Sequence, residues 1–261
     1  MTMKIKIDFT KSAQENADVF YRRSKKLIQK RKGAEEAIRE LSLRLKNIDL
    51  AAMEERKPAA MSHRAEWYEK FHWAMSSSGL LMIGGRDAQQ NELLNSKHFG
   101  DSDLFLHASI FGASVTVLKD GAQANRVIRE EAAQFAASYS SAWKDMLHSV
   151  DVYAMRRDQV SKSTGKGSIG TGSFLLSGER DWYRNTRLAL AFFVKDSRLN
   201  AVPQLTFDRL EERQRAHALV TQGKDKKSDA AKKIAAALDF YDINTIMQQL
   251  PAGTFHINTI K

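Results

Sequence analysis

The glycine-rich stretch from Gln159 to Gly178, QVSKSTGKGSIGTGSFLLSG, has the residue types that bind phosphate. Backbone N–H groups in a glycine turn can form an anion-binding nest, and hydroxyl and lysine side chains add further donors. This stretch is therefore a candidate phosphate-binding loop, and a plain connection between two strands is the alternative interpretation. The donors that it offers are Ser161, Lys162, Lys166 and Thr171.

Neither of the two common nucleotide-binding motifs fits this loop. Gly165, Gly167 and Gly170 match G-x-G-x-x-G, but that motif needs a helix directly after it, and here a strand is expected. The P-loop pattern fails because Val160 stands where its first glycine belongs and Gly167 follows the lysine in place of Ser or Thr. We therefore expect the loop to contact the phosphates of an RNA backbone rather than a nucleotide.

Residue types that a hydrolase uses are present, but not in a hydrolase pattern. His107, Asp87 and Ser109 offer the types of a catalytic triad, yet the nucleophile motif G-x-S-x-G is absent. The seven histidines show no H-E-x-x-H or comparable spacing, and the chain has no cysteine. We expect no catalytic site, no metal and no cofactor. The alternative is a nucleic-acid-modifying or hydrolytic enzyme that uses His107 with Asp87.

The charge of the chain indicates a polyanionic partner, and nucleic acid is the first candidate. The 261 residues carry a formal net charge of +10, and residues 1–57 alone hold an excess of six positive charges. Such a field attracts phosphate at long range. The sequence has no signal-peptide pattern at its start and no apolar run long enough to span a bilayer. We expect a cytoplasmic protein that does not enter membranes.

Residues 1–57 predict a coiled-coil helical arm with one apolar seam. From Ala13 to Ala52 a mostly apolar residue recurs at alternating steps of four and three, and Ser12 with Glu15 forms a capping box before it. A single helix cannot bury such a seam against itself. We expect a coiled-coil homodimer or a helical partner. The alternatives are a helix that lies on its own domain and a non-catalytic adaptor whose basic face is merely solvated.

After residue 57 the sequence changes to short apolar runs separated by glycine, serine and asparagine. In residues 58–200 these runs predict a hairpin at 71–83, a helix at 88–98 capped by Asp87, a long helix at 122–146 and several further strands. Residues 201–261 predict a helical C-terminal extension. The expected fold class is α/β (α+β), with a mixed sheet and flanking helices, a coiled-coil helix before them and a short helical tail after them.

Six short motifs, read in chain order, resemble the C-terminal RNA-binding domain of the NFACT family. They are WYEKFHW from Trp67, GGRDAQQNE from Gly84, D-x-x-x-HA ending at Ala108, GAS from Gly112, VSK from Val160 and TGSF from Thr171. The resemblance covers about residues 58–198, and the form is closer to the archaeal and eukaryotic branch. Upstream, IDFTKSAQENADVFYRRSKK is similar to the segment that opens the second coiled-coil arm of that family.

The resemblance implies one RNA-facing surface, formed by the turn before the 88–98 helix, by His107 and by the glycine-rich loop. The residues agree in part, because Arg86 can bind phosphate bidentately and two arginines lie just before the loop. The expected RNA-binding residues are Arg86, Asp87, His107, Arg156, Arg157, Ser161, Lys162, Lys166 and Thr171.

The family includes factors that recognise obstructed large ribosomal subunits and direct C-terminal tailing of the stalled peptide. Its N-terminal domain, helix-hairpin-helix module and first coiled-coil arm have no counterpart in this sequence. The resemblance therefore does not imply tailing activity for this chain by itself, which is expected to be a fragment or a short free-standing member. We expect an RNA-binding protein of translation or ribosome-associated quality control, not an enzyme, with the ribosome and the backbone of tRNA or large-subunit rRNA as partners.

The loop sequence predicts no nucleotide binding. Without a helix after the glycines there is no aligned dipole for a pyrophosphate, so ATP and GTP should show no micromolar affinity and no hydrolysis. Calorimetric titration of either nucleotide checks this. Tight binding that disappears in Lys166→Ala would contradict it.

Overall fold

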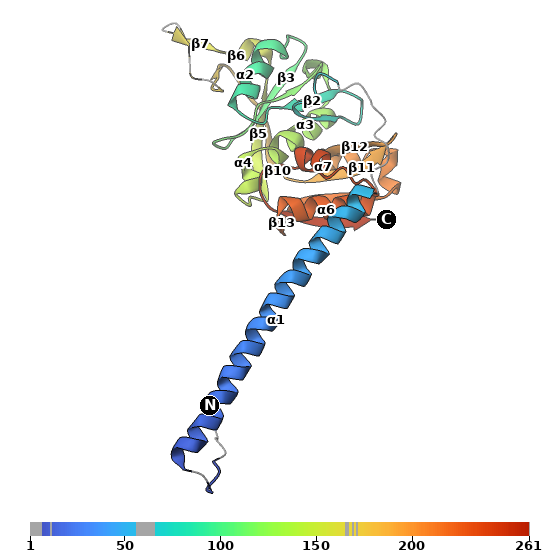
Figure 1. Cartoon of the computed structure of the whole chain (residues 1–261). Helices are drawn as coiled ribbons and strands as arrows, with labels where there is room; N and C mark the ends of the chain where they lie inside the picture. Colours follow the sequence, from blue (N-terminus) through green and yellow to red (C-terminus); the bar gives the residue numbers. More distant parts are fainter. Residues whose placement is uncertain are drawn as a thin grey trace. The chain divides into compact units, whose positions relative to one another are not determined.

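A computed structural model describes residues 7–10, 12–55, 66–164, 167–168, 170 and 172–260. The chain divides into two compact units, residues 1–59 and residues 60–261. The first unit is one long helix, drawn in blue in Figure 1, and the second is an α+β domain with two antiparallel sheets. The expected α+β class is confirmed.

The first unit consists of helix α1, Ala13–Glu55, which continues through Gly33 without a break. The capping box expected at its start is present. The backbone N–H of Ser12 donates to Glu15 Oε2 at 2.8 Å, and the backbone N–H of Glu15 donates to Ser12 Oγ at 3.2 Å. The first of these bonds, together with one from the Ser12 hydroxyl to Glu15 Oε2 at 2.8 Å, favours the charged carboxylate and lowers the pKa of Glu15.

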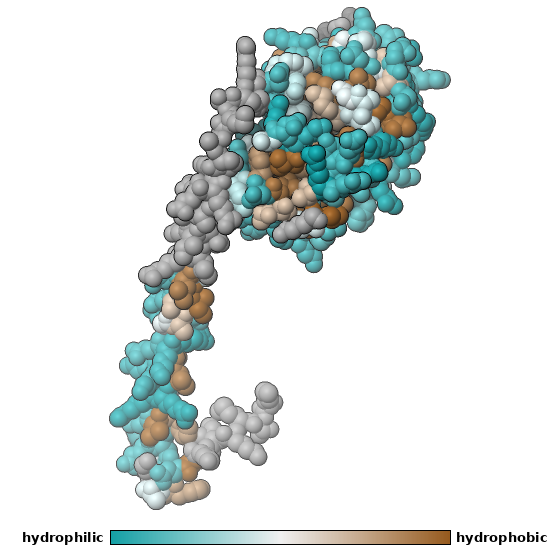
Figure 2. All heavy atoms as spheres, turned by 90° about the vertical axis from the view of Figure 1, so that its right-hand side faces the viewer, coloured by the Kyte–Doolittle hydropathy of each residue, from teal (hydrophilic) through white to brown (hydrophobic). Residues whose placement is uncertain are grey.

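The apolar seam of α1 is uncovered over the part whose side chains are described. Phe20 is 40% exposed, Leu27 58%, Ile38 64% and Leu41 58%. Figure 2 shows these apolar patches in brown, interrupted by hydrophilic side chains along the helix. Such a helix cannot bury its own seam. A coiled-coil homodimer or a helical partner for α1 stays a prediction.

In the second unit, six strands form the first sheet in the order β1-β2-β4-β3-β5-β10, and each neighbouring pair is antiparallel. The sequence had suggested a mixed sheet. The pairs are antiparallel because the helices connect strands that are not sheet neighbours, so no β-α-β crossover joins adjacent strands. The strands are β1 His72–Met75, β2 Leu81–Gly84, β3 Leu104–Ala108, β4 Thr116–Leu118, β5 Ser149–Met155 and β10 Asp181–Arg187.

Helices cover both faces of the six-stranded sheet. Alternation along β3 sends Leu104 and Leu106 to the face covered by α3, and Phe105 to the opposite face, where α2 lies. The predicted helix at 122–146 is two helices, because the chain leaves helical geometry at Tyr139 and Ser140 caps a new turn. The helices are α2 Ala88–Lys97, α3 Arg126–Ser138 and α4 Ser141–Lys144, with short 3-10 turns η1 Gly121–Gln123 and η2 Arg157–Gln159.

The glycine-rich loop follows β5 and folds into two short hairpins. Figure 1 shows β6 and β7 leading away from the six-stranded sheet. Strand β6, Val160–Ser161, pairs with β9, Leu175–Leu176. Strand β7, Ser163–Thr164, pairs with β8, Gly167–Ser168.

The C-terminal segment is not the helical tail that the sequence predicted. It adds strands to a second sheet in the order β12-β11-β13-β14, and residue 200 lies inside β12 rather than at a boundary. The misread strand β13 pairs with β11 and with β14, and a pattern within one short segment cannot reveal such distant pairing. The elements are β11 Leu190–Lys195, β12 Arg198–Pro203, α5 Gln204–Phe207, η3 Glu211–Gln214, β13 His217–Asp225, α6 Lys227–Leu238, α7 Ile243–Gln249 and β14 Phe255–Ile260.

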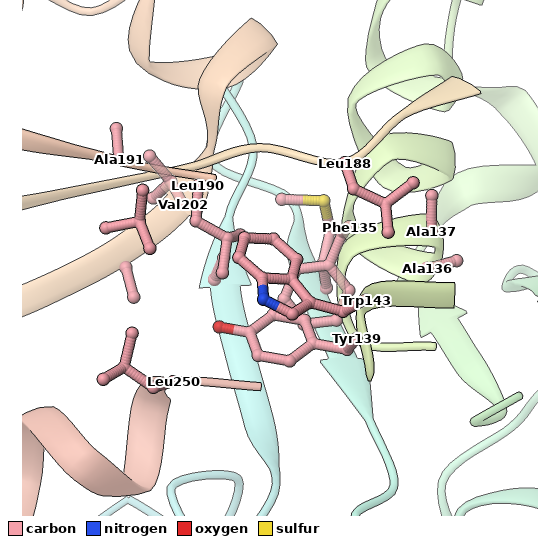
Figure 3. Packing of buried hydrophobic residues seen from close by; sticks show 14 of the residues in the cluster. Phe135, Ala136, Ala137, Tyr139, Trp143, Leu188, Leu190, Ala191, Val202 and Leu250 are labelled. Atoms are coloured by element: carbon pink, nitrogen blue, oxygen red, sulfur yellow. The ribbon is translucent and has the colours of Figure 1, made fainter. Parts of the chain in front are cut away.

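One core joins the two sheets, with α3 between them. Helix α3 packs on β3, β5 and β10 of the first sheet and on β12 of the second. Figure 3 shows Tyr139 and Trp143 projecting from the α3–α4 region toward the second sheet and Leu250. The Tyr139 hydroxyl donates to the Gln249 carbonyl at 2.8 Å, and Trp143 Nε1–H donates to the Thr254 carbonyl at 3.2 Å.

A buried carboxylate lies at the same junction. Glu131 of α3 is fully buried and accepts bonds from the Ser77 N–H at 2.8 Å and the Ser77 hydroxyl at 2.6 Å. It also accepts from the Thr206 hydroxyl at 3.0 Å, and Arg209 lies 3.7 Å away. Glu131 thus connects the β1–β2 turn to the segment after β12.

The exposed seam of α1 leads to a test of self-association. Leu41→Asp places a charge in the seam and should convert a homodimer to a monomer, because a buried unpaired charge is strongly unfavourable. Ser42→Asp adds the same charge one residue away, off the seam, and should leave the dimer intact. Sedimentation velocity measures both. A wild-type chain that is already monomeric would contradict the homodimer.

Candidate nucleic-acid interface

The start of α2 brings Asp87 and the glycine-rich loop together. Asp87 is exposed and caps α2 by accepting from the Gln90 N–H at 2.8 Å. Gly172 of the loop lies against the first turn of the helix, since a Cβ there would stand only 2.9 Å from that of Ala88. With its φ of +76°, position 172 needs glycine. Asp87 therefore positions the helix on which the loop rests.

Lys162 is a structural anchor of the loop. Its Nζ donates to Glu92 Oε2 at 2.5 Å, to the Gly170 carbonyl at 2.9 Å and to the Ser173 carbonyl at 3.1 Å, and it lies 5.2 Å from the Phe174 ring centre. An ammonium group has three N–H donors, so all are used. The sequence did not indicate these contacts, because α2 supplies a carboxylate from far away in the sequence. Phosphate binding by Lys162 stays a prediction.

The other loop donors have different positions. Ser161 is half-buried in β6, where it pairs with Leu175 of β9. Lys166 and Thr171 lie outside the described residues. Phosphate binding by Lys166 and Thr171 therefore stays a prediction.

His107 lies on β3 beside aromatic rings. Its ring is stacked 6.2 Å from Phe105, and its Nδ1 is 3.3 Å from the hydroxyl of Tyr153. Burial lowers the pKa of His107 and so favours the neutral imidazole. Asp87 is used in the cap of α2 and makes no contact with His107 in the described part of the chain. The acid–base pair that a hydrolase would use is therefore not formed by these two residues.

The arginines before the loop differ in how much of their donor capacity is used. Arg157 donates through Nη1 to the Val160 carbonyl at 2.7 Å and lies 5.1 Å from the ring centre of Phe99. Arg156 is exposed, and its backbone bonds to Gln159, through its N–H to Oε1 at 2.9 Å and through its carbonyl to the N–H at 3.2 Å. Its guanidinium has no hydrogen bond or ion pair among the described residues. Arg156 can therefore reach an external phosphate, while Arg157 mainly holds the turn.

Arg86 directly precedes Asp87, but its side chain is directed to other partners. Its Nη2 donates to the Phe71 carbonyl at 3.0 Å. Its charge lowers the pKa of Tyr139, at the end of α3, and so opposes the larger effect of burial. Burial lowers the pKa of Arg86. Among the described residues its side chain contacts neither His107 nor the loop, and the single RNA-facing surface that the resemblance implied stays a prediction.

Sequence reasoning missed a cationic and aromatic group at the edge of the six-stranded sheet. Arg180 lies 4.6 Å from the Tyr153 ring centre, and Arg184 lies 4.0 Å from the Trp182 ring centre. Tyr153 and Trp182 meet edge to face at 5.4 Å. The signal was the alternation of aromatic and arginine residues in RDWYR, residues 180–184, where no interface was predicted. We call His107, Tyr153, Arg180, Trp182 and Arg184 the β10 face.

A polar cavity of about 510 Å³ adjoins the β10 face. Arg180 belongs to both, and the cavity is lined by two further arginines, Arg129 and Arg156, and by three carboxylates, Asp158, Glu179 and Asp181. Arg129 is held by the Ala122 carbonyl at 2.9 Å and by Asp181 at 3.5 Å. The site thus combines exposed guanidinium groups with aromatic rings, a combination suited to phosphates and bases.

The role of Lys162 leads to a stability prediction. Lys162→Met removes three hydrogen bonds and an ion pair at a partly exposed site, so it should destabilise the loop by about 1–2 kcal/mol. Hydrogen exchange should show lost protection at residues 172–174 and little change in α3.

The same ion pair predicts a pH effect with a definite sign. The bond from Lys162 lowers the pKa of Glu92. The ion pair therefore stabilises the loop fully at a pH above the ordinary pKa of a glutamate, and this stabilisation is lost as the pH falls through the lowered pKa. Lys162→Met should reduce this acid sensitivity of the loop to the part that comes from the Gly172 N–H, which also donates to Glu92, at 3.2 Å. Unchanged protection in the variant at neutral pH would contradict the anchoring role.

Comparison of the sequence with known proteins matches part of this chain to a family. The model of the "NFACT protein RNA binding domain" matches residues 70–178. The archaeal Rqc2 homolog aRqcH of Methanocaldococcus jannaschii is 33% identical over 196 residues, covering 72% of this chain and 29% of that protein. The ribosome quality control complex subunit NEMF homolog of Drosophila melanogaster is 32% identical over 206 residues, covering 74% of this chain and 20% of that protein.

A human relative shows the same relation over a shorter span. The ribosome quality control complex subunit NEMF of Homo sapiens is 34% identical over 134 residues, covering 50% of this chain and 12% of that protein. The chain thus spans less than a third of the length of these relatives. In its described part, no helix is long and apolar enough to cross a membrane. The chain carries the RNA-binding domain of the NFACT family, at residues 70–178.

Proposed function

We propose that this chain binds RNA in ribosome-associated quality control and contacts the backbone of tRNA or of large-subunit rRNA. The family model is described as RNA binding, and the relatives are named as ribosome quality control proteins. The net charge of +10 suits a polyanionic partner. The ribosome is the proposed assembly and the cytoplasm the proposed location.

The observation that carries the proposal is the β10 face. Guanidinium planes over aromatic rings form a surface on which unpaired bases can stack, and every base has a face that can do so. The ring of His107 beside Tyr153 is held near neutrality by its lowered pKa, so it would offer a hydrogen bond rather than a charge. The face therefore favours single-stranded or looped RNA beside a backbone contact.

Arg156 and Arg180 are the proposed phosphate contacts of this surface. Arg156 is exposed, and Arg180 has aromatic neighbours but no ion pair within the described residues. Lys166 and Thr171 would add donors from the projecting loop. Asp87, Arg157, Ser161 and Lys162 would act by holding that loop and the α2 turn in place, rather than by direct contact.

The β10 face predicts two separable effects on RNA binding. Arg180→Gln removes one phosphate contact, so affinity should fall roughly 5- to 10-fold and the salt slope should flatten by about 0.7 to 0.9. Trp182→Leu removes a stacking platform and should weaken single-stranded RNA by roughly tenfold or more while changing duplex RNA little. Fluorescence anisotropy over a salt series measures both.

Arg213→Gln is the matched control, because Arg213 is exposed and lies in η3, away from the β10 face in the sequence and in its contacts. It removes the same charge and should change the affinity by less than about twofold. Equal losses in Arg180→Gln and Arg213→Gln would mean that only the overall charge matters. That outcome would sink the assignment to the β10 face.

A further inference from the structure

A second group of cations lies away from the β10 face, at the end of β2 and the start of α6. Arg86 follows β2, and Lys227 is the first residue of α6. Burial lowers the pKa of each, and the charge of Arg86 lowers the pKa of Lys227 further. The contacts bring them to one place, because Arg86 donates to Phe71, next to His72, and Lys227 donates to Leu250, next to Gln249. Tyr139 joins the two, since it stacks on His72 and donates to Gln249. The two cations therefore repel each other there, although they come from segments about 140 residues apart.

Neither cation has a carboxylate partner within the described residues. Arg86 donates to the Phe71 carbonyl at 3.0 Å, and Lys227 donates to the Leu250 carbonyl at 2.9 Å. Both acceptors are neutral. Several other half-buried cations of the domain have an acidic partner, such as Lys119 with Asp103 and Lys162 with Glu92. Two like charges without a counter-ion are unusual, because a buried charge is ordinarily paired.

Two aromatic groups complete the surroundings and add no negative charge. The rings of His72 and Tyr139 are stacked 4.1 Å apart, and the Tyr139 hydroxyl donates to the Gln249 carbonyl at 2.8 Å. In Figure 3 this hydroxyl points toward the segment that carries Leu250. Burial and the charges of Arg86 and Lys227 hold the pKa of His72 well below its ordinary value, so the imidazole is neutral.

The same place contains polar atoms without partners. Arg86 Nε and His72 Nδ1 are buried and have no hydrogen-bond partner among the described residues. One guanidinium N–H of five is used, by the Phe71 carbonyl. A buried donor without an acceptor is costly, and so is the repulsion between two cations. One anion would relieve both costs.

We propose that Arg86 and Lys227 bind a phosphate group, with His72 as an additional hydrogen-bond donor. A guanidinium can contact two oxygens of a phosphate at once, and an ammonium adds a point charge. Two positive charges match a phosphate monoester, and they also hold a phosphodiester. The ligand is therefore either a terminal phosphate or an internal phosphate of RNA, or a small free phosphate compound.

The site joins the family domain to the C-terminal segment. Arg86 and His72 lie within residues 70–178, whereas Lys227 and Leu250 come from the segment that forms the second sheet. Phosphate should therefore stabilise the junction between these two segments, where α6 packs on the second sheet. This follows from the local contacts and does not depend on the β10 face.

Thermal unfolding of the full chain in inorganic phosphate tests the site, with chloride at the same ionic strength as reference. At ten times the dissociation constant, wild type should gain roughly 3–6 °C in Tm. Lys227→Met should lose this gain, and in chloride it should unfold no earlier than wild type, because a repulsion has been removed. Lys232→Met removes the same charge on another side of α6 and should keep the gain.

A second readout separates binding at this site from binding elsewhere. An anion beside His72 offsets the two cations, so phosphate should raise the pKa of the His72 imidazole in an NMR titration. An equal Tm gain in wild type and Lys227→Met, no gain in wild type, or an unchanged His72 titration would each overturn the site. Arg180→Gln should leave all of these responses intact, which separates this proposal from the β10 face.

Paired RNA probes identify the source of the phosphate. If a short RNA with a 5′ phosphate binds roughly tenfold tighter than its 5′-hydroxyl form, and Lys227→Met removes the difference, the ligand is a terminal phosphate. If both forms weaken equally in Lys227→Met, it is an internal phosphodiester. If Lys227→Met changes neither form while the response to inorganic phosphate is lost, the site serves a small phosphate compound.

Discussion

The buried carboxylate of Glu131 is the interaction on which the domain depends most. A charged group without water is tolerated only when it is fully hydrogen-bonded, and Glu131 has acceptor sites for the β1–β2 turn and for the segment after β12 at once. Because α3 lies between the two sheets, this one side chain fixes the position of a segment from each sheet against the helix. The β10 face and the Arg86–Lys227 site are both formed by elements whose positions depend on this packing.

Local elements could be predicted from the sequence because their signals are local. The capping box at Ser12, the N-cap at Asp87 and the hairpin at 71–83 need only a few neighbouring residues, and each is present in the structure. The second sheet was missed because β13 and β14 are stabilised by pairing with each other and with β11. A strand of that kind is defined by its partners and not by its own pattern.

The candidate site was predicted in part for the same reason. Residue types indicated where the loop lies, but they could not show that Lys162 donates its hydrogen bonds to Glu92 and two carbonyls. The pairing of Arg180 with Tyr153 needs β5 and β10 side by side, which only the sheet provides. Sequence thus identified which side chains carry charge, and the fold decides which charges are available to a ligand.

The position of β14 at the end of the chain has a consequence for synthesis. Strands β11 and β13 lie near residues 190 and 220, but β13 lacks one neighbour until residues 255–260 have been made. Tyr139 and Trp143 likewise await carbonyls at 249 and 254. A ribosome that stops before these codons would leave a nascent chain with an unpaired strand edge and an open core, a state prone to aggregation.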